Sequence, residues 1–101
     1  MAEGVDVTED GARAIVVVRG EIDVATCPGL DAAVAGVTSP EIVLDLSDVT
    51  FMASSGLASL LRADRHATSL GGRVLLRSPS RAVVDVLQMT HLDDRFAIEQ
   101  A

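Results

Sequence analysis

Three short apolar runs, separated by segments of helical periodicity, constrain the fold of this chain more than any other feature. The runs at 14–19, 41–46 and 73–77 are rich in Val, Ile and Leu, as buried β-strands are. Between them, Leu, Ala and Val recur at helical spacing. This alternation predicts an α/β fold with a mixed, mostly parallel sheet of about four to five strands and three or more covering helices.

Turn and capping residues delimit the predicted elements of the N-terminal half. A weak strand at 5–8 leads through a hairpin turn into the first apolar run, which Gly20 ends. Thr26 is predicted to cap the first helix, and Pro28 fits its first turn, where no amide donor is missed. Pro40 forces the break before the next strand.

Similar signals delimit the C-terminal half. A second helix is predicted over about 54–70, with Gly71-Gly72 as its stop. Ser78-Pro79 is predicted to open the last helix with a capping residue followed by proline at the first helical position. That helix is predicted to end near His91, which takes a left-handed conformation. Residues 96–98 form either a short final strand or a terminal extension.

The composition fits one domain over residues 1–101. Hydrophobic residues make up 49% of the chain and aromatic residues only 2%, so the core must be built from Val, Leu, Ile and Ala. The net charge is −7, and all eight basic residues are arginine. An acidic chain repels phosphate backbones and anionic lipid surfaces, so we expect no direct binding to nucleic acid or membrane. A basic protein partner is compatible with this charge.

The residue types needed for catalysis or metal binding are scarce. Without lysine, the chain has no P-loop lysine, no Schiff-base lysine and no Ser–Lys dyad. His66 follows Ser54 by about three helical turns, roughly 18 Å, which is too far to act as its base. One cysteine and two scattered histidines make no zinc site. We therefore predict that the protein is not an enzyme and has no metal or cofactor.

The single cysteine, Cys27, cannot form an internal disulfide, which suits a reducing compartment. Residues 1–10 are acidic and lack the basic and apolar regions of a secretory signal. No apolar run approaches the roughly 20 residues of a membrane span. These features predict a cytoplasmic protein. Cys27 itself is interpreted as a small residue near a helix start, redox-sensing only if it is exposed.

Ser54 and Ser55 stand out because they lie where a helix begins, just past the carboxyl end of a predicted strand. Such strand ends are where α/β folds present ligand and partner sites. The first amides of a helix lack partners and the helix dipole is positive there, so a phosphate on either serine would find donors and a favourable field. Geometry alone favours the simpler interpretation of Ser54 as a plain N-cap.

Several segments, taken in order, resemble the STAS domain (the sulphate transporter and anti-sigma factor antagonist domain), particularly the stand-alone bacterial anti-sigma factor antagonist. They cover nearly all of the chain, and as a set they are specific. The matching segments are Gly20-Glu21-Ile22-Asp23, Ile42–Ser47 with Phe51-Met52, Ser54–Leu57 with Leu60-Leu61, Gly71–Val74, Ser78-Pro79 and Val83–Asp93.

The resemblance implies a protein that binds an anti-sigma factor and so frees a sigma factor for transcription. In that family the anti-sigma factor is commonly a serine kinase that phosphorylates the antagonist at the helix start, and a serine phosphatase resets it. The family's phosphoacceptor carries over to Ser54, with Ser55 as the alternative, and Asp23 matches an acidic residue beside that site. The partner-binding residues expected from the resemblance are Asp23, Thr26, Ser54, Ser55, Gly56, Ala58 and Arg62.

Two residues depart from the family's pattern. Ala53 stands where the family usually has aspartate immediately before the phosphoacceptor, and His91 stands where glycine is common. The absence of this carboxylate argues against recognition by the kinase. It also removes a negative charge that would repel a phosphate on the neighbouring serine. Ala53 therefore favours an alternative function, a non-phosphorylated STAS adaptor or scaffold subunit of a transport or stress-signalling complex. A third possibility, nucleotide or small-ligand binding at the same helix start, lacks a glycine-rich phosphate loop.

Overall fold

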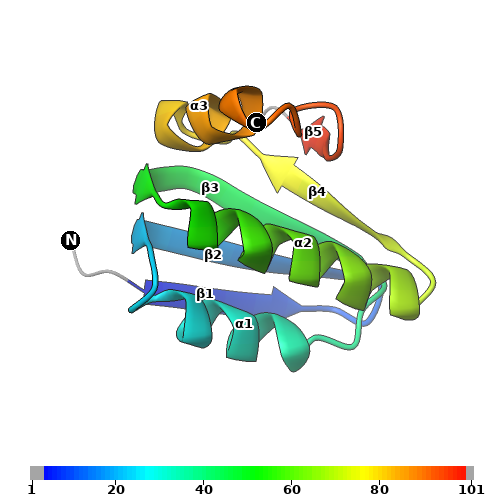
Figure 1. Ribbon diagram of the computed structural model, residues 1–101. Coiled ribbons are helices and arrows are strands. Elements are labelled where there is room, and N and C mark those ends of the chain that lie inside the picture. The colour runs from blue at the N-terminus through cyan, green and yellow to red at the C-terminus, as the bar shows by residue number, and fades with distance from the viewer. Residues whose placement is uncertain (1–3, 100–101) are drawn as a thin grey trace.

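The computed structural model describes residues 4–99, which form five strands and three helices (Figure 1). The strands lie side by side in sequence order, with β1 antiparallel to β2 and each remaining pair parallel. The predicted mixed, mostly parallel α/β sheet is confirmed. In chain order the elements are β1 (Gly4–Glu9), β2 (Arg13–Ile22), α1 (Cys27–Ala35), β3 (Glu41–Met52), α2 (Ser54–Ser69), β4 (Arg73–Arg77), α3 (Arg81–Met89) and β5 (Ala97–Glu99).

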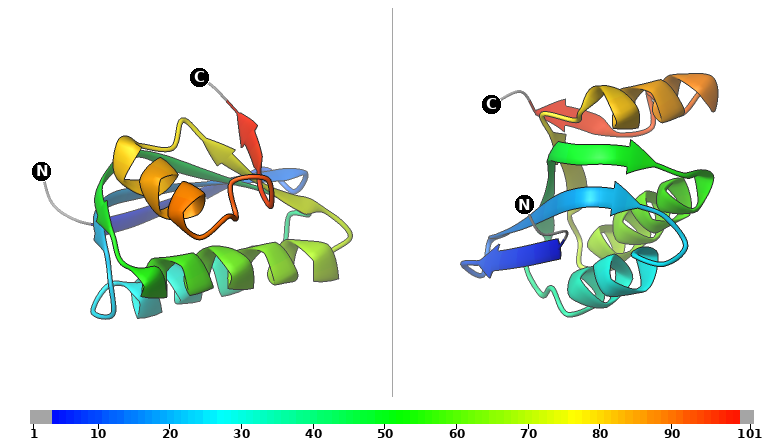
Figure 2. Two further views of the ribbon diagram at one scale, coloured as in Figure 1. Left: turned by 45° about the horizontal axis from the view of Figure 1, so that its top comes forward. Right: turned by 90° about the vertical axis from the view of Figure 1, so that its left-hand side faces the viewer.

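All three helices lie on the same face of the sheet (Figure 2). Each helix joins two neighbouring parallel strands: α1 joins β2 to β3, α2 joins β3 to β4, and α3 joins β4 to β5. Strand–helix–strand crossovers are right-handed, and these strands progress across the sheet in one direction. Each helix therefore returns over the same face, and the sheet has helical cover on one side only.

Aliphatic side chains fill the space between the sheet and the helices. Alternate strand positions point toward the helices, and Val16, Leu44 and Leu76 at such positions are completely buried. Leu60 of α2 and Val83 of α3 meet them from the helical layer. The core thus holds the Val, Leu, Ile and Ala residues that the composition predicted.

Charged side chains lie over the opposite face of the sheet. Val43 and Leu75 alternate onto that face and are nevertheless buried. We attribute their burial to the neighbouring arginines, whose aliphatic stems cover apolar surface while their guanidinium groups stay in water. The ion pairs of this face include Arg13–Glu41, Arg77–Glu99 and Arg19–Asp6, each with a nitrogen–oxygen distance of 2.6 Å.

Two strands extend farther than the apolar runs predicted. β2 continues past Gly20, which takes a φ of 88° beside a shift in register and does not end the strand. β3 continues past Leu46 to Met52, through polar residues that hide the strand in the sequence. Ile22 pairs with Met52 at the far end of both strands. The extension brings the ends of β2 and β3 to the same edge of the sheet.

The last helix begins later than predicted, at Arg81 with Ser80 as its N-cap residue. Ser78 takes a left-handed φ of 46°, and the amide of Ser80 donates a hydrogen bond of 3.2 Å to the carbonyl of Leu46 in β3. Pro79 therefore belongs to the turn that leaves the sheet, and its placement at the first helical position was wrong. Farther on, the alternative of a short final strand is confirmed by β5, which pairs with β4.

Helix α2 ends at the predicted glycine pair. Gly71 takes a φ of 82°, and its amide donates to the carbonyl of Thr68 at 3.0 Å. The amide of Gly72 donates to the carbonyl of Ala67 at 2.9 Å. These two bonds form a Schellman motif, which satisfies carbonyls that a helix end otherwise leaves without partners.

Helix α3 ends in the same motif with histidine in place of glycine. His91 takes a φ of 58°, and its amide donates to the carbonyl of Gln88 at 3.2 Å. The amide of Leu92 donates to the carbonyl of Leu87 at 2.9 Å. The predicted left-handed conformation of His91 is confirmed.

Replacing His91 with glycine is expected to raise the free energy of unfolding by about 1 kcal/mol. A side chain in the left-handed region costs roughly 1–2 kcal/mol, and the greater chain entropy of unfolded glycine offsets part of the gain. Thermal and urea unfolding of His91→Gly measure the effect. His91→Ala keeps the Cβ atom and should show no comparable gain. A His91→Gly protein no more stable than the wild type would contradict the expected strain.

By its spacing in the sequence, Asp64 falls on the apolar face of α2. An ion pair with Arg95 explains why a carboxylate occupies that position. The carboxylate of Asp64 lies 2.7 Å from Nη2 of Arg95, in the segment after α3. Helical periodicity gives no indication of a partner so distant in the chain. The ion pair links the segment after α3 to α2.

Glu9 at the end of β1 holds the segment between α1 and β3. Its Oε1 accepts hydrogen bonds of 2.7–3.0 Å from the amides and hydroxyls of Thr38 and Ser39. Ser39 is completely buried. The amide of Thr38, followed by the amide and hydroxyl of Ser39, lowers the pKa of the Glu9 carboxyl from its ordinary value of 4.5.

Glu9→Gln is expected to destabilise the protein near neutral pH, and the difference from the wild type should shrink in acid. Because the pKa of Glu9 is lower in the folded than in the unfolded chain, the stabilisation is fully present above the unfolded value. It is lost as the pH falls through the folded value. Urea unfolding of both proteins from about pH 7 to about pH 3 tests this. A difference that stays constant over this range would contradict it.

Candidate functional site

The carboxyl ends of β2 and β3 bring the predicted site residues to one edge of the sheet. Ile22 pairs with Met52, and the amide of Ala53 donates to the carbonyl of Ile22 at 2.9 Å. The turn that follows Ile22 begins with Asp23, and the helix that follows Ala53 begins with Ser54. The structure therefore brings together the two chain segments that the sequence singled out.

Ser54 is the first residue of α2, and Ala53 occupies the N-cap position. The interpretation of Ser54 as the N-cap was wrong, because Ala53 already has the extended backbone of a cap residue, with φ −82° and ψ 167°. The carbonyl of Ala53 accepts the amide of Gly56 at 2.9 Å. Within residues 4–99 no side chain caps α2, and its first turn has no acidic residue. The amides of Ser54 and Ser55 at the start of this helix are thus available to an added anion.

The two serines at the start of α2 differ in accessibility. Ser54 is exposed. The Oγ atom of Ser55 is buried and has no hydrogen-bond partner among the residues that the structure describes. Ser54 is therefore the more accessible of the two serines.

Gly56 allows the start of α2 to lie against the ends of β2 and β3. A Cβ atom at this position would lie 2.7 Å from Cγ of Met52 and 2.8 Å from Cγ2 of Ile22, closer than real Cβ atoms come. Gly56 is itself buried. The absence of a side chain at Gly56 therefore lets α2 begin close to Ile22 and Met52.

Asp23 and Thr26 form a self-contained turn beside this helix start. Oδ1 of Asp23 accepts the amides of Ala25 at 2.9 Å and of Thr26 at 3.1 Å. The hydroxyl of Thr26 accepts the amide of Asp23 at 2.9 Å and donates to the carbonyl of Glu21 at 2.8 Å. Thr26 precedes α1 but its hydroxyl does not cap that helix, because these bonds engage it in the turn. Thr26 does occupy the predicted N-cap position of α1, but its side chain makes no capping hydrogen bond to the helix.

Ala58 and Arg62 continue along α2 from the serines. Ala58 is half-buried and Arg62 is exposed. Nη2 of Arg62 lies 2.8 Å from the carboxylate of Asp31 in α1 and 3.1 Å from the hydroxyl of Ser59. Arg62 therefore links α1 and α2, and a partner that used its guanidinium group would compete with Asp31.

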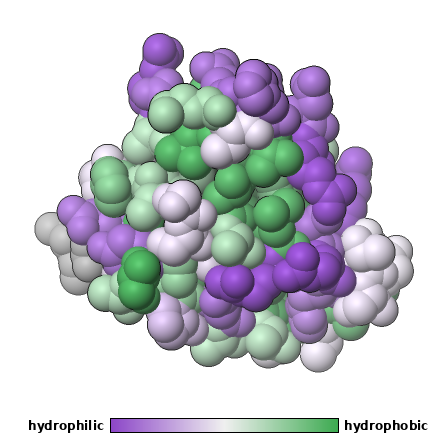
Figure 3. All heavy atoms as spheres, viewed as in Figure 1, coloured by the Kyte–Doolittle hydropathy of each residue, from purple (hydrophilic) through white to green (hydrophobic). Residues whose placement is uncertain are grey.

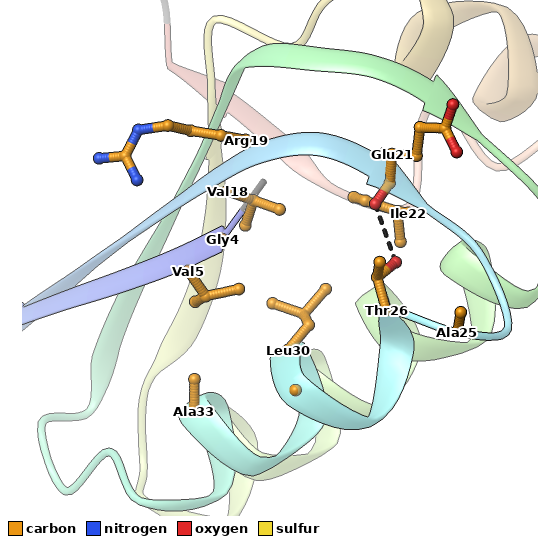
Figure 4. Close-up of a pocket in the computed structure, with 11 residues that line it drawn as sticks. Gly4, Val5, Val18, Arg19, Glu21, Ile22, Ala25, Thr26, Leu30 and Ala33 are labelled. Atoms are coloured by element: carbon orange, nitrogen blue, oxygen red, sulfur yellow. Dashed lines mark hydrogen bonds between the residues drawn. The ribbon is translucent and has the colours of Figure 1, made fainter. Parts of the chain in front are cut away.

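A groove that was not predicted from the sequence lies between β1, β2 and α1 (Figure 4). It has a volume of about 470 Å³ and a largely apolar lining that includes Val5, Val18 and Leu30. Thr26 stands at one end, with its bond to the carbonyl of Glu21 (Figure 4). Small residues of α1 that line this space leave it open. In the sequence, their spacing indicates only that they belong to a helix.

Two exposed apolar side chains at the sheet edge were also missed. Val24 is 78% exposed and Phe51 is 51% exposed. Apolar atoms are visible over the ends of β2 and β3 in the space-filling view (Figure 3). In the sequence, Val24 follows Asp23 directly and Phe51 lies shortly before Ser54. Sequence alone, however, does not distinguish an exposed from a buried valine or phenylalanine.

Cys27 adjoins this edge through its backbone, because its amide donates to the carbonyl of Asp23 at 2.9 Å. Nε2 of His66 lies 2.8 Å from the carbonyl oxygen of Val37, and Cys27 is buried as a free thiol. Across residues 4–99 no group of His, Cys, Asp or Glu side chains is arranged to hold a metal ion. No helix of the same region is long and apolar enough to cross a membrane.

Comparison with known proteins connects this fold to a family. The family model for the Mlab, STAS domain matches residues 5–99. An anti-sigma factor antagonist from Mycobacterium paratuberculosis is 29% identical, with a TM-score of 0.84 over 97% of this chain and 86% of that chain.

Two further structures share the fold at lower sequence identity. The unphosphorylated anti-sigma factor antagonist SpoIIAA is 21% identical, with a TM-score of 0.83 over 97% of this chain and 88% of that one. The phosphorylated Bacillus SpoIIAA is 20% identical, with a TM-score of 0.77 over 97% and 91%. Because the family model spans nearly all of the described sheet and helices, the chain belongs to the STAS domain family.

Proposed function

We propose that this protein is a cytoplasmic anti-sigma factor antagonist, a binding protein and not an enzyme. It binds an anti-sigma factor of the serine-kinase type and thereby releases a sigma factor for transcription. The kinase phosphorylates Ser54 and ends the interaction, and a serine phosphatase restores it. The STAS fold and the likeness to an antagonist at 29% identity support the partner class.

The observation that carries the proposal is the exposed Ser54 at the uncapped start of a long helix. A phosphate there meets amides without side-chain partners and the positive end of the helix dipole, so the folded domain accommodates it. The buried Oγ of Ser55 supports Ser54 over its neighbour as the phosphoacceptor. The residues proposed to surround or position this contact are Asp23, Thr26, Ser55, Gly56, Ala58 and Arg62.

Sigma release tests the proposed partner directly. The purified chain is added to preformed complexes of the host's sigma factors with their anti-sigma factors, and free sigma factor is measured by size-exclusion chromatography. The expected result is stoichiometric release from one of these complexes. Failure to release sigma factor from any of them would overturn the proposal.

Ala53 supports a second candidate function, a STAS adaptor that binds its partner without phosphorylation. An aspartate before the phosphoacceptor, usual in the family, is absent here. Recovery of the protein from its host without phosphate under every growth condition, together with stable partner binding, would favour the adaptor. A phosphorylated fraction would exclude it.

A further inference from the structure

Two large apolar side chains are exposed in the segments that lead to the edge that carries Ser54. Val24, in the turn between β2 and α1, is 78% exposed, and Phe51, next to the last residue of β3, is 51% exposed. Hydrophobic atoms over this edge are visible in Figure 3. Exposed apolar groups that gather at one place mark sites of contact with other proteins.

Both side chains belong to the segments that flank Ser54. Phe51 precedes Ser54 in the same chain segment, on the final stretch of β3. Val24 follows Ile22, whose carbonyl accepts the amide of Ala53 at 2.9 Å. A partner surface that covered Ser54 and the ends of β2 and β3 would therefore meet an apolar side chain of the turn after β2 and another on β3.

The charge of the same segments is acidic only. Residues 22–26 and 47–56 contain Asp23 and Asp48 and no arginine. Asp48 is exposed, and seven of the eight arginines, all except Arg65, form ion pairs elsewhere in residues 4–99. The complementary surface is an apolar patch with basic residues around it.

We propose that Val24 and Phe51 anchor the anti-sigma factor around Ser54, through apolar side chains of the partner that basic residues surround. Phosphorylation then ends binding by desolvation, because the apolar contact would bury the phosphate. This inference rests on the proposed function and names the contact through which it is regulated.

Desolvation follows from the position of the phosphate. The start of α2 accommodates an anion, so phosphorylation leaves the domain folded and its effect arises where the partner docks. A phosphate of about −1.5 to −2 charge is strongly hydrated, and an apolar contact offers no donors to replace that water. Repulsion between like charges is the competing explanation, and it would require acidic residues on the partner.

Substitution of the two anchors tests the contact, with the anti-sigma factor that binds the wild-type chain as the probe. Val24→Ser and Phe51→Ser are each expected to weaken binding by about 10-fold in titration calorimetry. Met89→Ser is the matched control, because Met89 is 80% exposed and is the last residue of α3. Its affinity should equal that of the wild type. Unchanged affinity in both anchor variants would overturn the proposed contact.

Salt dependence separates desolvation from repulsion. Wild type and Ser54→Asp are compared at ~0.05 M and ~0.5 M ionic strength, over which exposed charges become screened. Wild-type affinity should fall with salt, since the acidic edge faces basic residues. The ratio of wild-type to Ser54→Asp affinity should not fall, because the partner's basic residues attract the added charge and salt only screens that attraction. A ratio that shrinks as salt rises would overturn desolvation in favour of repulsion.

These outcomes are distinguishable from failure of the proposed function. If the wild-type chain releases no sigma factor, the proposed function fails and this inference fails with it. If the chain releases sigma factor and Ser54→Asp does not, while Val24→Ser and Phe51→Ser act as the wild type does, the function stands and this inference alone fails.

Discussion

Aspartate in place of Ser54 is expected to weaken binding to the cognate anti-sigma factor by at least about 100-fold, or ~2.7 kcal/mol. The carboxylate would place a negative charge at the first position of α2, where the proposed partner covers the exposed hydroxyl. Within the domain the same charge is favourable, because it faces uncapped amides and the positive end of the helix dipole. Binding should therefore be lost without loss of folding.

Two measurements on Ser54→Asp separate these effects. Titration calorimetry against the anti-sigma factor should show the loss of affinity. Thermal unfolding should give a midpoint equal to or slightly above that of the wild type. Ser54→Asn, a neutral residue of nearly the same size as aspartate, is the control and should retain most of the affinity. Equal affinities for Ser54→Asp and the wild type would exclude Ser54 from the interface.

Replacement of Gly72 by alanine is expected to lower the free energy of unfolding by about 3 kcal/mol or more. A Cβ atom on Gly72 would lie 1.8 Å from the carbonyl oxygen of Pro40 and 2.3 Å from its carbonyl carbon. These are backbone atoms that cannot rotate away. The same carbonyl accepts the amide of Arg73 at 3.0 Å, where β4 begins beside β3. Relief of the clash would disturb both the end of α2 and the β3–β4 pairing.

Gly29→Ala is the matched control for this substitution. Gly29 lies in α1, and a Cβ atom there meets nothing within 4 Å. Alanine should therefore stabilise the helix by up to about 1 kcal/mol. Thermal unfolding should show a midpoint lower by about 12 °C or more for Gly72→Ala and slightly raised for Gly29→Ala. A Gly72→Ala protein as stable as the wild type would contradict the close approach.

The sequence was sufficient for the elements whose pattern is local. Apolar runs located the central strands, and the glycine pair after Ser69 located the end of α2 to within a residue. The boundaries that were missed depend on contacts between distant segments. β3 continues through polar residues because β2 pairs with it, and α3 starts late because the amide of Ser80 bonds to Leu46.

The candidate site was predictable in position and less so in its chemistry. The serines were placed past a strand end from the sequence pattern, and Asp23 was placed beside them by the resemblance to the STAS family. The pairing of Ile22 with Met52 brings both segments to one edge. The different accessibility of Ser54 and Ser55 was not predictable, because it depends on how α2 lies on the sheet. The exposure of Val24 and Phe51 depends on the same packing.

Intact mass after incubation with ATP and the host's anti-sigma kinases tests most directly whether Ser54 is the regulatory site. We expect a gain of one phosphate in the wild-type chain and in Ser55→Ala, and no gain in Ser54→Ala. A phosphate that persists in Ser54→Ala, or no phosphate on the wild type with any of these kinases, would contradict a switch at Ser54.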